Sequence, residues 1–350
     1  MATTEKRRAD TAQVRDRLET YLQRSGLKQR SLAVVPLTGD ASDRRYFRVV
    51  LRDAPSVVLA LHPESFSYET LPFVHIASLL GQMPLAVPAL IDHADDLALL
   101  VLQDLGDVTL QAYLGAVQPS EHIRLYRQAV TLIEILQRRG ADLASPAYPP
   151  YQVAFDVEKF VWELEFFTKH FIEGYRGVAL TPVVRDALVG EWRNLAGLLA
   201  AEPLVLCHRD YHSRNLMLSR GELYVIDFQD ARMGPDTYDL ASLLRDSYVD
   251  LPDDDSHALI DHFVALKREG CPDTATTEWE RAFRGRFEMM ALQRNLKALG
   301  TFGYQTTARS NPVYMQYIPR TLRYVSMALE RQPQFVHLRE LLAGVVDEIV

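Results

Sequence analysis

The spacing of apolar residues changes character near residue 103. Before that point, short β-type apolar runs bounded by turn residues predict strands over residues 32–36, 46–51, 56–61, 87–91 and 97–102. Val14, Leu18 and Leu22 recur every four residues, which predicts an amphipathic helix over 11–27. Residues 71–80 are also expected to be helical. Five strands and one short helix, with the leading helix, are enough for a small β-rich lobe.

Beyond residue 106 the pattern becomes almost wholly helical. Pro119 and Gly140 are a helix start and stop signal for the first of these helices. The helices are predicted over residues 119–140, 155–171, 182–199, 238–248, 256–268, 277–299 and 312–329. The single β signal in this half is a hairpin over 216–228. We therefore predict an α+β fold with a small lobe over 1–103, a hinge over 103–106 and a helical lobe over 104–350.

Composition narrows the class of protein without identifying it. The chain is 48% hydrophobic and 24% charged, which are ordinary globular values, and its formal net charge of -8 argues against a nucleic-acid binder. Cys207 and Cys271 provide neither a disulfide framework nor metal-ligand spacing. No apolar run reaches the ~18 residues of a membrane span, and the first ten residues are polar. We expect a soluble cytoplasmic monomer with no membrane partner.

Candidate chemistry is concentrated in residues 206–228. His208, Asp210 and Asn215 form the pattern His-x-Asp-x-x-x-x-Asn, and twelve residues later an apolar run reaches Asp227. Transfer of a phosphoryl group from ATP requires a carboxylate that takes the acceptor's proton and oxygen ligands that hold Mg²⁺. We predict Asp210 as the catalytic base and Asn215 with Asp227 as metal ligands.

The predicted hairpin makes this assignment more specific. Residues 216–218 and 223–228 are its strands and 219–222 its turn. Antiparallel partners across a short turn lie side by side, so Asn215 and Asp227 come to the same end. A chance motif before an ordinary hairpin is the alternative. The coincidence of motif, hairpin and terminal aspartate argues against it.

Four segments resemble the aminoglycoside phosphotransferase and choline kinase branch of the protein-kinase-like superfamily. They cover residues 37–42, 208–210, 226–228 and 234–241. The last segment stands where protein kinases carry an activation segment, and its different sequence is typical of a small-molecule kinase. The resemblance implies a bilobal kinase-like fold and a small-molecule acceptor.

Further segments resemble a narrower group, the bacterial anomeric sugar kinases of cell-wall recycling. They cover residues 39–48, 72–77, 102–107, 208–217, 227–231, 237–248 and 292–300. These enzymes phosphorylate N-acetylmuramate and N-acetylglucosamine at C1. The resemblance implies a sugar substrate, ATP with Mg²⁺, and an α-sugar 1-phosphate product. An anomeric hydroxyl is more acidic than an ordinary alcohol, so the demand on Asp210 as a base would be modest.

The small lobe departs from the kinase pattern in one respect. Most kinases hold the α- and β-phosphates with a lysine on the third strand, but no lysine occurs between Lys28 and Lys159. Arginines in or after the phosphate-facing loop are the expected substitutes, because a guanidinium suits phosphate oxygens. Solvated strand charges are the alternative. The predicted nucleotide-binding residues are Gly39, Asp40, Ala41, Ser42, Arg44, Arg45, Arg48, Gln103 and Leu105.

Three basic residues are candidates for sugar recognition. His212 lies two residues after Asp210, where protein-serine kinases have a lysine that faces the transferred phosphate. Arg245 and Arg294 lie among apolar neighbours in predicted helices, where an inward charge needs a polar partner. The alternatives are a loop-packing histidine and arginines paired on helix surfaces. His208 and Asp239 are expected to be structural, holding the catalytic loop.

Two rival functions remain open: phosphorylation of an aminoglycoside or another hydroxylated small molecule, and a regulatory pseudokinase. Asp250, Asp253, Asp254 and Asp255 form an acidic cluster that would suit a cationic aminoglycoside, although a solvated turn at a helix start is the more common reading. The missing lysine would also fit a regulatory pseudokinase that binds nucleotide without turnover.

Overall fold

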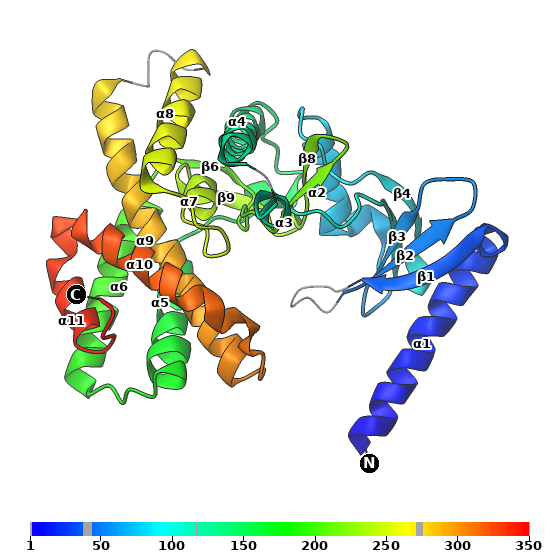
Figure 1. Cartoon of the computed structure of the whole chain (residues 1–350), viewed down its shortest axis with the longest axis horizontal. Helices are drawn as coiled ribbons and strands as arrows, with labels where there is room; N and C mark the ends of the chain where they lie inside the picture. Colours follow the sequence, from blue (N-terminus) through cyan, green and yellow to red (C-terminus); the bar gives the residue numbers. More distant parts are fainter. Residues whose placement is uncertain (1, 38–43, 117, 271–275, 350) are drawn as a thin grey trace.

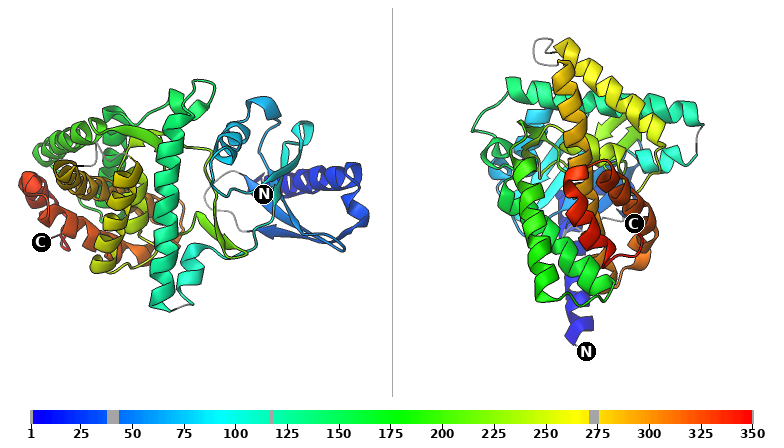
Figure 2. Two further views of the ribbon diagram at one scale, coloured as in Figure 1. Left: turned by 90° about the horizontal axis from the view of Figure 1, so that it is seen from above. Right: turned by 90° about the vertical axis from the view of Figure 1, so that its left-hand side faces the viewer.

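The computed structural model describes residues 2–37, 44–116, 118–270 and 276–349. Its two lobes lie side by side, with the N-terminus in the small lobe and the C-terminus in the large one (Figures 1 and 2). This is the α+β bilobal kinase-like architecture that the sequence predicts. Among the described residues, no helix is both long and apolar enough to cross a bilayer.

The small lobe contains an antiparallel sheet with strand order β1-β2-β3-β5-β4. Its strands are β1 (Ser31–Leu37), β2 (Arg45–Leu51), β3 (Val57–Leu61), β4 (Leu90–Ala94) and β5 (Leu99–Gln103). The prediction placed the fourth strand three residues too early, because the apolar run over 87–91 only partly overlaps it. The strand β5 ends at Gln103, where we propose that the first lobe ends.

The two faces of this sheet belong to different cores. Helix α1 (Ala2–Arg24), which begins earlier than predicted, packs Leu18 and Leu22 against Leu59 and Val101. Side chains alternate along a strand, so Ala60 faces the other way. There, together with α2 (Pro72–Gly81), it joins the core of the large lobe. The side of β3 that faces the cleft is thus continuous with the catalytic lobe.

The large lobe is mainly helical. Its α-helices are α3 (Leu110–Leu114), α4 (Pro119–Asp142), α5 (Val157–Phe167), α6 (Pro182–Ala200), α7 (Tyr238–Leu244), α8 (Asp253–Gly270), α9 (Thr277–Thr307), α10 (Ile318–Glu330) and α11 (Val336–Ala343). The π-helix η5 (Thr168–Tyr175) continues α5. Short 3-10 helices occur in both lobes. They are η1 (Leu27–Gln29), η2 (Tyr68–Thr70) and η3 (Asp95–Leu97) in the small lobe, and η4 (Pro149–Gln152), η6 (Pro312–Tyr317) and η7 (Pro333–Phe335) in the large lobe.

The large lobe contains two small sheets instead of the single predicted hairpin. The hairpin itself is present as β7 (Leu216–Ser219) and β8 (Glu222–Val225). The prediction missed the antiparallel pair β6 (Leu204–Cys207) and β9 (Arg232–Pro235). These strands have four residues each, too few for a periodic signal, and they are joined only through the intervening catalytic loop and hairpin.

Two glycines bring α9 unusually close to α5 and η5. A Cβ at Gly300 would lie 2.8 Å from the Cα of Phe167, and a Cβ at Gly303 would lie 2.3 Å from the carbonyl oxygen of His170. Only a residue without a side chain allows this approach. This close packing determines which side of α9 faces α5 and the catalytic loop.

Candidate active site

A cleft of about 1060 Å³ lies between the lobes. Its small-lobe end is lined by Leu37, Arg44, Tyr46, Val58, Leu102, Gln103 and Leu105. Its opposite end, which we call the acceptor end, is lined by Ser242, Tyr248, Arg294, Lys297, Phe302 and Tyr314. Asp210, Asn215 and Asp227 also line the cleft.

The catalytic loop connects β6 to β7 and is held by backbone contacts. Asp239, fully buried on α7, accepts hydrogen bonds from the backbone N–H groups of His208 (2.7 Å) and Arg209 (3.0 Å). His208 Nε2 lies 2.9 Å from the carbonyl oxygen of Ile226, next to Asp227. On the far side of the loop, Asp246 accepts bonds from the N–H and hydroxyl of Ser213. The loop is thus fixed independently of any substrate, which favours the structural roles expected of His208 and Asp239.

The hairpin brings the two predicted metal ligands to the same end. Leu216 pairs with Val225, and the N–H of Ile226 donates to the carbonyl oxygen of Asn215 at 3.0 Å. Asn215 Nδ2 donates to the carbonyl oxygen of Asp210, which orients the amide and leaves Oδ1 as the atom for a cation. Asp227 has a left-handed backbone (φ +62°). Its side chain is 46% exposed.

These two side chains suit Mg²⁺ by their chemistry. An amide oxygen and a carboxylate are hard donors, and Mg²⁺ in kinases takes one or two carboxylates together with phosphate and water oxygens. A left-handed aspartate is an uncommon conformation that clusters at functional sites. Asn215 and Asp227 therefore remain our candidates for holding the metal.

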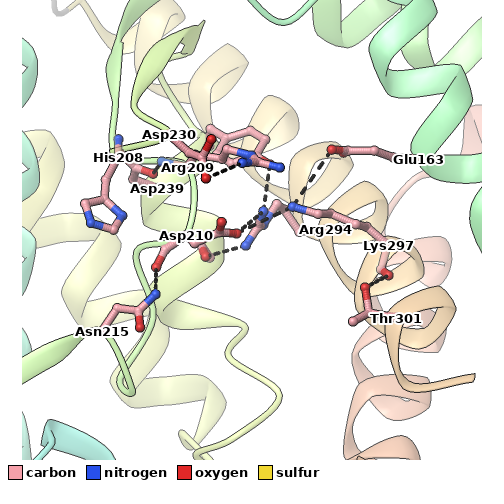
Figure 3. A network of polar contacts seen from close by, with 12 residues as sticks. Glu163, His208, Arg209, Asp210, Asn215, Asp230, Asp239, Arg294, Lys297 and Thr301 are labelled. Atoms are coloured by element: carbon pink, nitrogen blue, oxygen red, sulfur yellow. Dashed lines mark hydrogen bonds and ion pairs between the residues drawn. The ribbon is translucent and has the colours of Figure 1, made fainter. Parts of the chain in front are cut away.

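Asp210 faces a group of cations (Figure 3). Its Oδ1 lies 3.5 Å from Lys297 Nζ and 3.8 Å from Arg294 Nη1, and both of these residues come from α9. Burial raises the pKa of Asp210, but the charges of Lys297, Arg294 and Arg209 outweigh this effect and hold the pKa well below its usual range. Asp210 is therefore an ionised carboxylate of low basicity.

The three candidate arginines of the small lobe differ in their position relative to the cleft. Arg44 lines the cleft, and its Nη2 lies 3.8 Å from Asp227 Oδ1. Arg48 instead donates to Asp104 at 2.6 and 2.9 Å and to Asp107 at 2.8 Å, so it ties β2 to the hinge. Arg45 is exposed and is not among the residues that line the cleft. The structure thus argues against Arg45 and Arg48 as phosphate ligands and leaves Arg44.

The remaining nucleotide-site residues fall into two groups. Gly39, Asp40, Ala41 and Ser42 lie outside the described residues. Gln103 and Leu105 both line the cleft at the hinge. Gln103 Oε1 accepts a hydrogen bond from the N–H of Ala89 at 3.2 Å. The hinge strand is thereby held against the segment that precedes β4.

The predicted sugar-binding residues also behave differently from one another. Arg294 donates to the Tyr238 hydroxyl (2.6 Å) and to Ser242 Oγ (2.7 Å) while facing Asp210 at the acceptor end. Arg245, whose side chain is 2% exposed, is engaged by Asp253, Glu288 and Ser256. Arg245 also lines the cleft. Because these groups of its own chain occupy the guanidinium, we propose a structural role for it in place of sugar binding.

His212 packs its ring edge-on against Tyr248, with 5.2 Å between the ring centroids. Burial lowers the pKa of His212 to about 3, although the nearby charge of Asp210 opposes this shift. The imidazole is therefore neutral near pH 7. It can form hydrogen bonds at the acceptor end but cannot provide the positive charge of a lysine.

Sequence reasoning missed two charged residues of this site. Lys297 lies one turn after Arg294 on the same face of α9, and Glu163 reaches it from α5. The spacing of three residues between Arg294 and Lys297 was a usable signal, because such residues are neighbours on a helix. Glu163 offered no comparable signal, since its position depends on how two helices pack.

Comparisons with known sequences identify the family of this chain. The sequence profile of the phosphotransferase enzyme family (APH) matches residues 33–279. The N-acetylmuramate/N-acetylglucosamine kinase of Pseudomonas aeruginosa is 32% identical over 316 residues, which are 89% of this chain and 88% of that protein. The protein of the same name from Neisseria meningitidis serogroup B is 32% identical over 95% of this chain and 96% of its own length.

Solved structures of similar fold come from both branches suggested by the sequence. ADP-bound aminoglycoside phosphotransferase APH(2'')-Ib has a TM-score of 0.59 at 14% identity, covering 91% of this chain and 98% of that one. A choline/ethanolamine kinase family protein from Mesorhizobium loti has a TM-score of 0.54 at 17% identity, covering 89% and 92% of the two chains. On its profile match, its relatives and the arrangement of its cleft, this chain is a phosphotransferase with an alcohol acceptor and belongs to the phosphotransferase enzyme family (APH).

Proposed function

We propose that this protein transfers the terminal phosphoryl group of ATP to the C1 hydroxyl of an amino sugar, N-acetylmuramate or N-acetylglucosamine. The observation that carries the proposal is the position of Asp210. It is an ionised carboxylate between the acceptor end of the cleft and the hairpin end that carries Asn215 and Asp227. The names of its relatives support the sugar, since each is 32% identical over most of the chain.

Each of the chain's own groups has a defined task in this proposal. Asp210 orients the acceptor hydroxyl and takes its proton. Asn215 and Asp227 hold Mg²⁺, which when bound neutralises charge on the phosphate oxygens. Arg44 takes the place of the absent lysine, because its guanidinium reaches the cleft beside Asp227 from the start of β2.

The weak basicity of Asp210 supports an acidic acceptor. A carboxylate held among three cations is a poor base for an ordinary alcohol. A hemiacetal hydroxyl such as the sugar C1–OH gives up its proton more easily, so orientation and charge stabilisation suffice. This argument favours C1 over the other hydroxyls of the sugar.

The walls of the acceptor end suit a sugar ring. Tyr248, Phe302 and Tyr314 form a chain of ring contacts there, with centroid distances of 6.2 and 5.6 Å. Binding sites for small molecules combine such apolar surfaces with a few polar groups that fix orientation. We propose that these rings pack against the sugar and that His212 and Arg294 provide polar contacts.

Phosphorylation of an aminoglycoside, the main rival, loses its strongest feature. In the acidic cluster, Asp253 pairs with Arg331 at 2.5 Å and with Arg245 at 2.9 Å, and Asp250 pairs with Arg323. None of the four aspartates is among the residues that line the cleft. The pseudokinase alternative is weakened by Arg44, which offers a cation where the lysine is missing.

The deciding experiment measures ADP release with Mg²⁺ and ATP across free sugars, 1-O-methyl glycosides and kanamycin-type drugs. We expect turnover of the free N-acetyl hexosamines and none of their methyl glycosides, in which C1–OH is blocked. Turnover of the glycosides would place the reaction at another hydroxyl. Turnover of the drugs alone would favour the rival, and nucleotide binding with no turnover would favour the pseudokinase.

We also propose that the protein acts as a monomer in the cytoplasm. Asp210, Asn215, Asp227 and Arg44, to which this proposal gives roles, all line one cleft, so the proposed reaction needs no residue from a second subunit. Sedimentation equilibrium of the purified protein tests this, and a stable dimer would contradict it.

A further inference from the structure

The catalytic loop has no cation at the position two residues after its aspartate. That position holds His212, which is neutral and packed against Tyr248. Arg294 is nearby, but its guanidinium already donates to Tyr238 and Ser242. His212 therefore does not supply the charge that a lysine at this position would direct at the transferred phosphoryl group.

Lys297 fills this gap from a distant part of the sequence. Its Nζ lies 3.5 Å from Asp210 Oδ1, nearer than the guanidinium of Arg294 at 3.8 Å. The side chain is 19% exposed and lines the acceptor end of the cleft, so the ammonium can reach a bound group. Its ammonium lies between Asp210 and Glu163 (Figure 3). A lysine provides a compact charge with three donors, enough for Asp210 and one further oxygen.

Glu163 holds this lysine on its other side. Its side chain is 1% exposed, and its Oε1 lies 3.9 Å from Lys297 Nζ and 3.5 Å from Lys159 Nζ. Its Oε2 accepts a hydrogen bond from Gln293 at 2.8 Å. Charges thus alternate from Lys159, near the surface of α5, through Glu163 and Lys297 to Asp210.

This alternation keeps an otherwise unfavourable charge in place. Burial lowers the pKa of Lys297, and the charges of Arg294 and Arg209 act in the same direction. Glu163 and Asp210 oppose them. An unpaired buried ammonium is costly, so Glu163 is the partner that allows Lys297 to remain ionised when Asp210 is occupied with a substrate.

We propose that Lys297 is a catalytic residue whose ammonium bridges Asp210 and the transferred phosphoryl group, and that Glu163 is the positioning residue that holds it there. The inference rests on the proposed kinase function. In the step, the acceptor oxygen forms a bond to the γ-phosphorus and gives its proton to Asp210. The bond from that phosphorus to the β–γ bridging oxygen breaks, and its electron pair leaves on ADP. Lys297 donates to a phosphoryl oxygen, where negative charge is spread in the transition state.

The test compares Lys297→Met with Lys297→Arg and with Lys169→Met, an exposed lysine of η5 as the matched control. We expect Lys297→Met to lower kcat about 10²-fold, with KM for ATP within about twofold, as for loss of one transition-state donor. Lys297→Arg should recover part of kcat, and the control should match the wild type. Calorimetry gives a readout without turnover. Lys297→Met should weaken binding of the sugar 1-phosphate product about tenfold and leave binding of ADP and free sugar unchanged, because of these three ligands only the product carries the transferred phosphoryl group.

A structural role would give a different pattern. Lys297→Met leaves Glu163 buried without this partner, so the variant can lose stability. The double variant Glu163→Gln/Lys297→Met removes both charges and should show the same loss of kcat in a folded protein. A kcat within about threefold of the wild type in either variant, or an equal loss of ADP, sugar and product binding, would overturn the assignment.

The Glu163→Gln variant tests the positioning role. Without Glu163 the pKa of Lys297 falls further, and a cation of lowered pKa loses its charge as the pH rises. We expect kcat to fall at a lower pH on the alkaline side than in the wild type. An unchanged alkaline limb would remove Glu163 from the proposal.

The proposed sugar kinase function and the catalytic role of Lys297 can be disproved separately. If the wild type turns over no sugar, the proposed function fails, and Lys297 is then judged on Mg²⁺-dependent transfer to water in the same assay. If the Lys297→Met variant still hydrolyses ATP like the wild type, the catalytic role of Lys297 is overturned as well. A wild-type chain that transfers to neither sugar nor water would overturn both.

Discussion

The two walls of the cleft are built on different principles. The small-lobe wall presents apolar side chains such as Val58 and Leu102 and the cation Arg44, which lies 3.8 Å from Asp227. The large-lobe wall is a network of opposite charges in which Lys297 lies between Asp210 and Glu163 and Arg294 also faces Asp210. A nucleotide can bind the first wall by shape. The charges of the second wall are paired with one another before substrate binds. Removing one of them therefore leaves its partner as an unpaired charge, which is unfavourable.

The largest expected effect lies at the centre of the charged wall. Asp210→Asn keeps the shape of the side chain and removes the base, so kcat should fall about 10²–10⁴-fold. ATP affinity, which depends mainly on the other wall, should change little. Steady-state kinetics and nucleotide calorimetry check this, and a variant that keeps a tenth of the activity would remove Asp210 from its role.

The structural role proposed for Arg245 gives the next effect, this time on stability. Arg245→Met leaves Asp253 and Glu288 without a buried partner, although Arg331 still pairs with both. We expect a loss of about 2 kcal/mol in the free energy of unfolding and a KM for sugar within about twofold of the wild type. Denaturant unfolding and kinetics are the measurements. A selective rise in KM with unchanged stability would restore Arg245 to sugar binding.

A smaller and opposite pattern is expected on the small-lobe wall. Arg44→Ala should raise KM for ATP about tenfold, or about 1.4 kcal/mol, the scale of one charged hydrogen bond. Stability should change little because Asp227, which lies 3.8 Å from the Arg44 guanidinium, is 46% exposed and stays solvated when Arg44 is removed. Arg45→Ala is the matched control on the neighbouring, exposed position. If both variants behave alike, Arg44 is not the substitute for the missing lysine.

The smallest expected effect is on the pH dependence of the unfolding free energy, and it comes from Glu202. Burial raises the pKa of Glu202 to about 8, with Asp236 acting in the same direction, while Thr237 and Arg286 oppose the shift. The folded protein therefore holds a proton that the unfolded chain releases above the ordinary carboxyl range. This contribution to stability is complete below about pH 4.5. It declines as the pH rises toward 8. Glu202→Gln should flatten the dependence of the unfolding free energy on pH over that window without changing kcat, and an unaltered slope would contradict the shift.

Local sequence determined the parts of this protein whose residues are close together in the chain. The hairpin had to bring Asn215 and Asp227 to one end, because register across a short turn is fixed by neighbouring residues. Apolar spacing likewise predicted most helices and the five strands of the small lobe. The apolar run over 87–91 misplaced β4, and the four-residue strands β6 and β9 escaped detection.

Tertiary structure alone decided which charges meet. Lys297 reaches Asp210 and Glu163 only because Gly300 and Gly303 let α9 approach α5 and η5, and no periodicity along one helix reports its distance from another. The same holds for the arginines. Arg44 and Arg48 differ only slightly in sequence context, yet one faces the cleft and the other binds Asp104. Residue types specified the possible chemistry, while packing between elements distant in the chain selected the residues able to perform it.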